Sequence, residues 1–165
     1  MSYPRTHISL YVSDIEKSKE FYERFFQRKA VKLKEDYAKF ILDEPSLIIS
    51  FVENPEKVNP SFGHLGFQVE TKEELQAKLE EFKASQFELR EEMDINCCYA
   101  YQDKFWVEDP DGHQWEIYYF HADSEFSDPR FQESTAQACC IPKKEIIPKL
   151  DFLKPAACIA DSGCC

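Results

Sequence analysis

Two histidines, one glutamate and an adjacent pair of cysteines are the residues of this chain most suited to joint chemistry. His7 and His64 each open a segment in which apolar and polar residues alternate, and Glu116 lies inside the aromatic and apolar segment Gln114 to Phe120. A carboxylate in such surroundings is costly to bury unless it is paired or bound to a metal. Two histidines and a carboxylate form the facial triad of non-haem Fe(II) enzymes, and Mn(II), Ni(II) or catalytic Zn(II) accept the same ligands. We therefore predict a metal site at His7, His64 and Glu116, with Fe(II) favoured.

The seven cysteines of the 165-residue chain are unevenly placed. Their odd number and the absence of an export signal make a disulfide framework a poor explanation, and favour metal, metalloid or redox chemistry. Cys97 and Cys98 are adjacent, and a regular strand would direct their sulfurs to opposite faces. Joint binding by this pair requires a bulge or a loop, and we expect a mobile loop near Arg90 to Asn96. The other cysteines follow residue 135: Cys139, Cys140, Cys158, Cys164 and Cys165.

An internal repeat indicates how these residues are positioned. His7 to Ser13 and His64 to Glu70 are alternating segments, and each leads into an amphipathic helix with a capping residue, Ser13 or Asp14 in the first copy and Thr71 in the second. Further strands are expected over residues 30–35, 37–43 and 46–52 in the first copy, and 87–92, 97–102, 105–108 and 114–120 in the second. The turn before the last strand is Asp109-Pro110-Asp111-Gly112.

The repeat predicts an α+β fold of two βαβββ modules, at about residues 5–55 and 62–121 of a domain spanning 1–121. If the modules pack about a pseudo-twofold axis, His7 and His64 face each other across a cleft between curved sheets. The counterpart of Glu116 falls within 47–51, which offers no strong ligand, so three protein ligands are expected. His113 and His121 lack the repeat correlation and are interpreted as solvated loop residues. Residues 122–165 are expected to form a loosely ordered tail with a short helix near 144–153.

Charge and composition exclude several classes of partner. There are 31 acidic and 20 basic residues, which gives a formal charge of −11 and a pI near 4.8. Such a field repels phosphate backbones and anionic lipid surfaces, so nucleic acid and membranes are not expected as partners. The first residues lack the apolar run of a signal peptide, and no run of about 18 apolar residues could span a membrane. We expect a cytoplasmic protein that is a monomer or a homodimer.

These residues resemble the vicinal-oxygen-chelate superfamily, which includes glyoxalase I, extradiol dioxygenases and fosfomycin-resistance thiol transferases. The resemblance covers about residues 5 to 121. Glu91-Glu92-Met93-Asp94, then Asn96-Cys97-Cys98-Tyr99-Ala100 and Gln102-Asp103-Lys104-Phe105-Trp106-Val107, is similar to the signature of the ArsI organoarsenical carbon–arsenic lyases and the related CadI cadmium-induced proteins.

This resemblance implies an enzyme that uses Fe(II) and O2 to cleave the carbon–arsenic bond of trivalent organoarsenicals such as methylarsenite, which releases arsenite. His7, His64 and Glu116 would bind iron, and Cys97 and Cys98 would bind arsenic. Residues that flank the cysteines and shape the pocket would be Tyr99, Tyr101, Lys104 and Trp106. Two alternatives stay open: a glyoxalase-like isomerase or thiol transferase that uses another divalent metal, and a non-catalytic protein that binds cadmium or arsenite.

Overall fold

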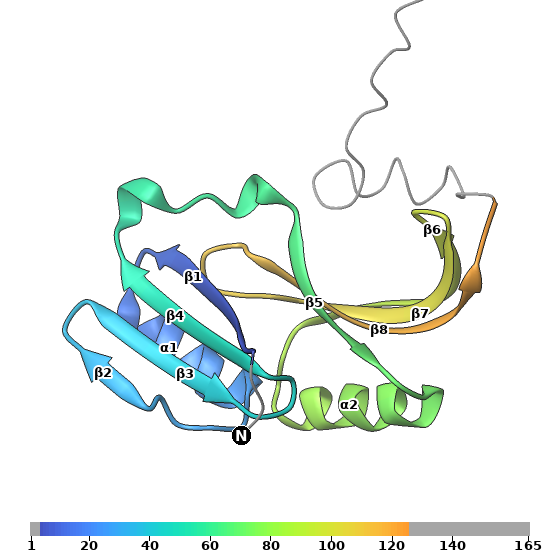
Figure 1. The fold of residues 1–165 in the computed structure, drawn as a ribbon, viewed down its shortest axis with the longest axis horizontal. Helices are drawn as coiled ribbons and strands as arrows, with labels where there is room; N and C mark the ends of the chain where they lie inside the picture. Colours follow the sequence, from blue (N-terminus) through green and yellow to red (C-terminus); the bar gives the residue numbers. More distant parts are fainter. Residues whose placement is uncertain (1–3, 126–165) are drawn as a thin grey trace, which may run out of the picture.

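The structure, a computed structural model, describes residues 4–125 (Figure 1). The elements follow in the order β1 (Thr6–Val12), α1 (Ile15–Phe25), β2 (Lys32–Lys34), β3 (Tyr37–Leu42), β4 (Leu47–Glu53), the 3-10 turns η1 (Pro55–Lys57) and η2 (Pro60–Phe62), β5 (His64–Val69), α2 (Lys72–Ala84), β6 (Leu89–Cys97), β7 (Ala100–Glu108) and β8 (Gln114–Asp123). The predicted tail helix and the five tail cysteines lie outside the described residues. Neither helix within 4–125 is long and apolar enough to span a membrane.

The two halves share one topology, which confirms the predicted pair of βαβββ modules. One sheet has the strand order β1-β4-β3-β2, and the other has the order β5-β8-β7-β6. In each sheet the first strand pairs in parallel with the last strand of its module, and the remaining pairs are antiparallel. β1 and β5 are therefore edge strands at equivalent positions. Figure 1 shows the two sheets side by side, each with its helix on one face.

The helices begin where the capping residues predict. The Asp14 side chain accepts a hydrogen bond from the backbone N–H of Lys17 at 3.0 Å, and Thr71 Oγ1 accepts one from Glu74 at 3.1 Å. Each cap satisfies an amide that has no partner within its helix. A second bond in the latter cap joins Glu74 Oε2 to the backbone N–H of Glu70 at 2.9 Å. Both helices are therefore fixed directly after the strand that carries a site histidine.

Two predicted strand assignments in the second module are wrong. The segments predicted at 97–102 and 105–108 belong largely to one continuous strand, β7, while Cys97 ends β6. The expected loop near Arg90 to Asn96 is part of β6, with an irregularity in its pairing between Glu92 and Ile95. Joint binding by two adjacent cysteines suggests a loop before them, but β6 keeps its backbone pairing to β7 on both sides of that irregularity.

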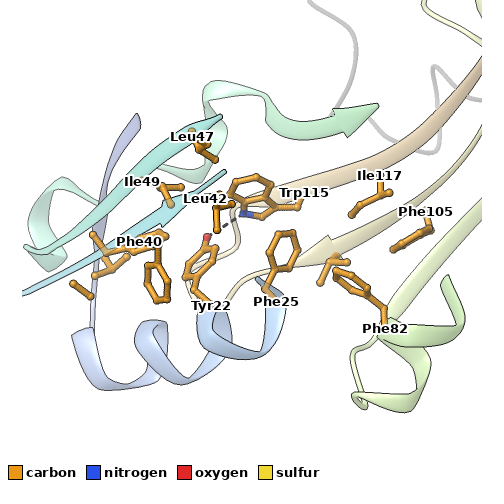
Figure 2. Close-up of a cluster of buried hydrophobic side chains, with 14 of the residues drawn as sticks. Tyr22, Phe25, Phe40, Leu42, Leu47, Ile49, Phe82, Phe105, Trp115 and Ile117 are labelled. Atoms are coloured by element: carbon orange, nitrogen blue, oxygen red, sulfur yellow. Dashed lines mark hydrogen bonds between the residues drawn. The ribbon is translucent and has the colours of Figure 1, made fainter. Parts of the chain in front are cut away.

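One aromatic core joins the two modules. Tyr22 and Phe25 project from α1 toward Trp115 of β8, as Figure 2 shows, and the Phe25 ring centroid lies 5.0 Å from that of Trp115. Phe25 also packs edge to face on Phe82 of α2 at 5.2 Å. Since α1 belongs to the first module while Trp115 and Phe82 belong to the second, burial of these rings stabilises both halves together.

A buried polar network lies beside this core. Tyr22 donates its hydroxyl proton to Asp109 Oδ2 at 2.7 Å and accepts a hydrogen bond from Trp115 Nε1 at 3.0 Å. His113 Nδ1 lies 2.9 Å from the same Asp109 oxygen, and His113 is only 2% exposed. The interpretation of His113 as a solvated loop residue is therefore wrong: the turn at Asp109 folds the imidazole back against the carboxylate. The network connects α1 to the β7–β8 turn.

Candidate metal and dithiol site

His64 and Glu116 come together on the face of the second sheet that points away from α2. β5 and β8 are parallel, with His64 opposite Gln114 and Gly66 opposite Glu116. His64 Nε2 lies 3.4 Å from Glu116 Oε2, and Glu116 is 7% exposed. Gly66 permits the close approach of β5 to β8 at this point, because a Cβ at that position would lie 2.7 Å from the Glu116 backbone carbonyl oxygen. Two of the three predicted metal ligands are thus adjacent in one chain.

Lys104 supplies the positive charge of this site. Its side chain is fully buried, and Nζ donates a hydrogen bond to Glu116 Oε1 at 2.9 Å and lies 3.7 Å from Glu92 Oε2. Burial raises the pKa of Glu116, but the contact with His64 and the attraction of Lys104 outweigh it, so the pKa lies below its ordinary value. Glu116 is held as a carboxylate with one oxygen bound to Lys104 and the other facing His64.

The donor set of His64 and Glu116 fits a divalent metal. Metal bonds of about 2.0–2.2 Å place two ligands on adjacent octahedral positions about 3 Å apart. The separation of 3.4 Å between Nε2 and Oε2 is close to that spacing. An imidazole nitrogen and a carboxylate oxygen are also two of the three groups of a facial triad.

His7 does not join this pair within one chain. It is exposed on the edge strand β1, and within residues 4–125 no three His, Cys, Asp or Glu side chains form a group that could hold a metal ion. The strand registers make Ser50 the counterpart of Glu116, since His7 lies opposite Ile48 as His64 lies opposite Gln114. The described part of the first module therefore offers a histidine at the equivalent position and no carboxylate beside it.

Cys97 and Cys98 direct both sulfurs to one side despite being adjacent. Cys97 is the last residue of β6 and pairs with Ala100, while Cys98 and Tyr99 form a two-residue turn with φ values of 54° and 65°. This left-handed turn takes Cys98 out of the strand alternation, and the two sulfurs lie 3.3 Å apart. Cys97 is 3% exposed and Cys98 is exposed. The irregular backbone that joint binding requires is present at the turn itself.

The cysteine pair and the metal-ligand pair open on one cavity of about 510 Å³. Sequence reasoning identified five of its lining residues: His64, Cys97, Cys98, Lys104 and Glu116. It missed the others: Gln68, Ala100, Gln102, Tyr118 and Phe120. Strand alternation could have found several, because Tyr118 and Phe120 follow Glu116 at steps of two, and Gln68 follows His64 at a step of four. Tyr118 donates a hydrogen bond to Gln68 Oε1 at 3.1 Å, which links β8 to β5 along the cavity.

The remaining predicted pocket residues lie around the cavity without lining it. Trp106 packs edge to face on His64, with 5.1 Å between ring centroids, and its ring faces the ammonium of Lys104 at 4.9 Å. Tyr99 is 60% exposed at the hairpin turn. The ring of Tyr101 stacks on His121 at 4.4 Å. His121 is a β8 residue whose Nε2 lies 3.1 Å from Asp103 Oδ2, so its interpretation as a solvated loop residue is also wrong.

Residues 5–117 match the Glyoxalase/Bleomycin resistance protein/Dioxygenase superfamily. The chain is a member of this superfamily. Its fold resembles other solved structures, among them a possible glyoxalase from Bacillus cereus, which has 23% sequence identity and a TM-score of 0.53 over 70% of this chain and 98% of that one. A glyoxalase/bleomycin resistance protein/dioxygenase from Nocardioides has 18% identity and a TM-score of 0.56 over 78% and 89% of the two chains. These likenesses confirm the predicted fold class.

Closer relatives confirm the resemblance to the organoarsenical branch of the superfamily. A trivalent organoarsenical cleaving enzyme of Bacillus sp. strain MD1 is 37% identical over 96% of this chain and 97% of its own length. A probable trivalent organoarsenical cleaving enzyme of Bacillus subtilis strain 168 is 42% identical over 82% and 89%. The cadmium-induced protein CadI of Mycobacterium bovis is 34% identical over 82% and 92%.

Proposed function

We propose that this superfamily member cleaves the carbon–arsenic bond of trivalent organoarsenicals such as methylarsenite, with Fe(II) and O2, and releases arsenite. The observation that carries the proposal is the shared cavity, which places a dithiol and a histidine–carboxylate pair within one space. The names of the relatives at 37% and 42% identity support the same substrate class.

The two donor sets suit two different elements. Thiolates prefer soft, thiophilic centres, whereas imidazole and carboxylate prefer harder metals such as Fe(II). With its sulfurs 3.3 Å apart, the Cys97–Cys98 pair can bond one arsenic atom through both thiolates. The organic group of that arsenical would then extend into the cavity, where Tyr118 and Phe120 offer aromatic surface.

His64, Glu116 and the exposed His7 of a second copy of the chain would hold the iron. Bound there, iron would supply the activation of O2. The residues of the chain itself orient and bind: Lys104 occupies one oxygen of Glu116 and leaves the other directed at His64, and Trp106 packs against the His64 ring. The atoms of one methylarsenite and one O2 equal those of one arsenite and one formaldehyde, so the overall reaction needs no additional reductant.

A second copy of the chain could complete the site because the two modules have edge strands at equivalent positions. β1 and β5 each pair on one side only within residues 4–125, and each carries a predicted metal-ligating histidine. Unpaired strand edges are ready-made sites for pairing with another chain. A symmetric dimer would use the same contact twice and complete two equal sites.

The decisive experiment is an aerobic assay of methylarsenite with purified protein and Fe(II), in which arsenite and formaldehyde are both quantified. We expect the two products in equal amounts and no turnover without O2. The double variant Cys97→Ser/Cys98→Ser should lose the activity. The matched control is Cys139→Ser/Cys140→Ser, which removes one of the two other adjacent cysteine pairs and should keep the activity. Full activity without O2, or in the Cys97→Ser/Cys98→Ser protein, would refute the proposal.

The alternative of a non-catalytic cadmium or arsenite binder is favoured by the CadI relatives and by the close sulfur pair. It predicts stoichiometric binding of arsenite or Cd(II) at Cys97 and Cys98 with no release of formaldehyde from methylarsenite. A glyoxalase-like or thiol-transferase activity leaves the dithiol in the cavity without a role, so it is the weaker alternative. A hemithioacetal assay with Ni(II) or Mn(II) tests it.

A further inference from the structure

The strand that leads to Cys97 contains one extra residue, and this residue decides which face Cys97 occupies. Glu92 lies opposite Lys104 in the pairing of β6 with β7, but Ile95 lies opposite Gln102, so three steps on β6 match two on β7. Uninterrupted alternation from Glu92 would turn Cys97 to the opposite face of the sheet. The bulge restores Cys97 to the face that carries Lys104 and the cavity.

A buried carboxylate holds the bulge from the other face of the sheet. Asp103 is 0% exposed, and its Oδ1 accepts a hydrogen bond from the backbone N–H of Asp94 at 2.5 Å. Asp94 is the bulge residue with a left-handed backbone, at φ 60°, and its own carboxylate accepts a hydrogen bond from Tyr101 Oη. Asp103 thus binds the backbone of Asp94, which has a conformation that residues other than glycine rarely adopt.

Side chains from two other elements contact the Asp103 carboxylate and favour its charged form. Asp103 Oδ2 lies 2.8 Å from Lys72 Nζ, at the start of α2, and 3.1 Å from His121 Nε2 in β8. Burial alone would raise the pKa of Asp103. Hydrogen bonds with Lys72, the Asp94 amide and His121 lower the pKa by a larger amount, so the net pKa is below its ordinary value. A charged acceptor makes a stronger hydrogen bond to an amide than a neutral one does.

We propose that Asp103 is a positioning residue for the arsenic-binding dithiol: by fixing the Asp94 bulge, it sets the register that directs Cys97, with Cys98 in the turn beyond it, into the cavity. This inference rests on the proposed function, because it assigns Asp103 to the substrate-binding half of that site. Asp103 does not line the cavity and touches no predicted metal ligand. Its loss should therefore affect arsenical binding and leave metal binding unchanged.

The test measures the two kinds of binding separately, in the full chain with all five tail cysteines changed to serine so that Cys97 and Cys98 are the only thiols. Phenylarsine oxide is titrated without iron, and the thiols that it protects from a thiol reagent are counted. Co(II) is titrated without arsenical. For Asp103→Ala we expect phenylarsine oxide affinity to fall by about tenfold or more, and protection to fall from two thiols to one, with Co(II) affinity unchanged within about twofold.

Two further proteins make the test specific. Asp103→Asn keeps an oxygen that can accept a hydrogen bond from the Asp94 N–H. Its affinity for phenylarsine oxide should therefore fall less than that of Asp103→Ala. Asp94→Gly keeps the amide donor and favours the positive φ, so it should bind phenylarsine oxide like the parent. The proposal is overturned if Asp103→Ala binds phenylarsine oxide like the parent, or if it loses Co(II) in the same proportion.

A measurement on the parent protein, in which only the five tail cysteines are changed to serine, covers the case in which Asp103→Ala does not fold. Coupling between two sites is reciprocal, so arsenical binding must stabilise the bulge if the bulge positions the dithiol. Hydrogen exchange at the Asp94 amide should slow by about tenfold when phenylarsine oxide binds, and unchanged exchange would exclude the coupling. If the parent protein binds no phenylarsine oxide at Cys97 and Cys98, the proposed function fails first. Parent binding with an unaffected Asp94 amide refutes only the role of Asp103.

Discussion

Lys104 brings a buried ammonium group to the cavity. Two carboxylates, Glu92 and Glu116, approach its buried ammonium, and the Trp106 ring faces it. Removing one partner of a buried ion pair leaves an uncompensated charge in a medium that solvates it poorly. A divalent cation at His64 and Glu116 would supply compensating charge at the same place.

We therefore expect Lys104→Met to lower the free energy of unfolding of the metal-free protein by about 3–5 kcal/mol. Saturating Co(II) should restore more of this stability in the variant than it adds to the wild type. Urea unfolding with and without Co(II) measures both effects. Lys34→Met, at an exposed lysine of β2, serves as the control and should change stability by less than about 0.5 kcal/mol. Equal losses in the two variants would contradict the assigned role of Lys104.

The sequence identified individual site residues better than their partners. The repeat and the resemblance selected His64, Glu116, Cys97 and Cys98, and the structure places all four around one cavity. The interpretations of His113 and His121 failed because their partners, Asp109 and Asp103, are brought to them by the β7–β8 turn and by strand pairing. A pattern along the chain does not contain such pairings.

At the scale of secondary-structure elements, alternation and capping residues predicted both helices and the order of elements in two βαβββ modules. The errors fell on the β6–β7 hairpin. Its turn is Cys98-Tyr99, two residues with positive φ that are neither glycine nor asparagine, so no turn signal marks it. The bulge at Asp94 breaks the alternation from which the strands were inferred, because it changes the period within one strand.

The carboxylate that binds the bulge should make the stability of the protein depend on pH. The folded-state pKa of Asp103 is lowered, so its charged form stabilises the protein above the ordinary carboxyl value of 3.8, and this contribution is lost as pH falls through the lower folded value. Asp103→Asn should therefore be less stable than the wild type above about pH 3.8. That margin should shrink below about pH 3.8. Urea unfolding of both proteins between pH 3 and 7 tests this, and a margin independent of pH would contradict it.

At the scale of the whole molecule, the Tyr22 hydroxyl connects the two modules. It bridges Asp109 and the indole of Trp115, and both are buried. Tyr22→Phe should lower the free energy of unfolding by about 1–3 kcal/mol, because it leaves buried polar atoms without a partner. Tryptophan fluorescence reports on the second module, since both tryptophans lie there, and circular dichroism reports on the whole chain. The two transitions should coincide; separate transitions would show that the modules unfold independently. Tyr37→Phe, at a half-buried ring, is the matched control and should have little effect.

The number of chains in one complete site can be tested by complementation. In a dimer, His7 of one copy would meet His64 and Glu116 of the other, so His7→Ala and Glu116→Ala proteins should each be inactive alone. A mixed dimer would contain one site with all three ligands and one site lacking two. Random association of equal amounts should therefore restore about a quarter of wild-type methylarsenite turnover and of Co(II) binding.

Co-refolding of the two variants, with each variant refolded alone as the control, measures this recovery. If each chain builds its own site, mixing will restore nothing, because every chain still lacks a ligand. Recovery that occurs only in the mixture would explain why His7 is exposed on the edge strand β1 while His64 and Glu116 already lie together in the same chain.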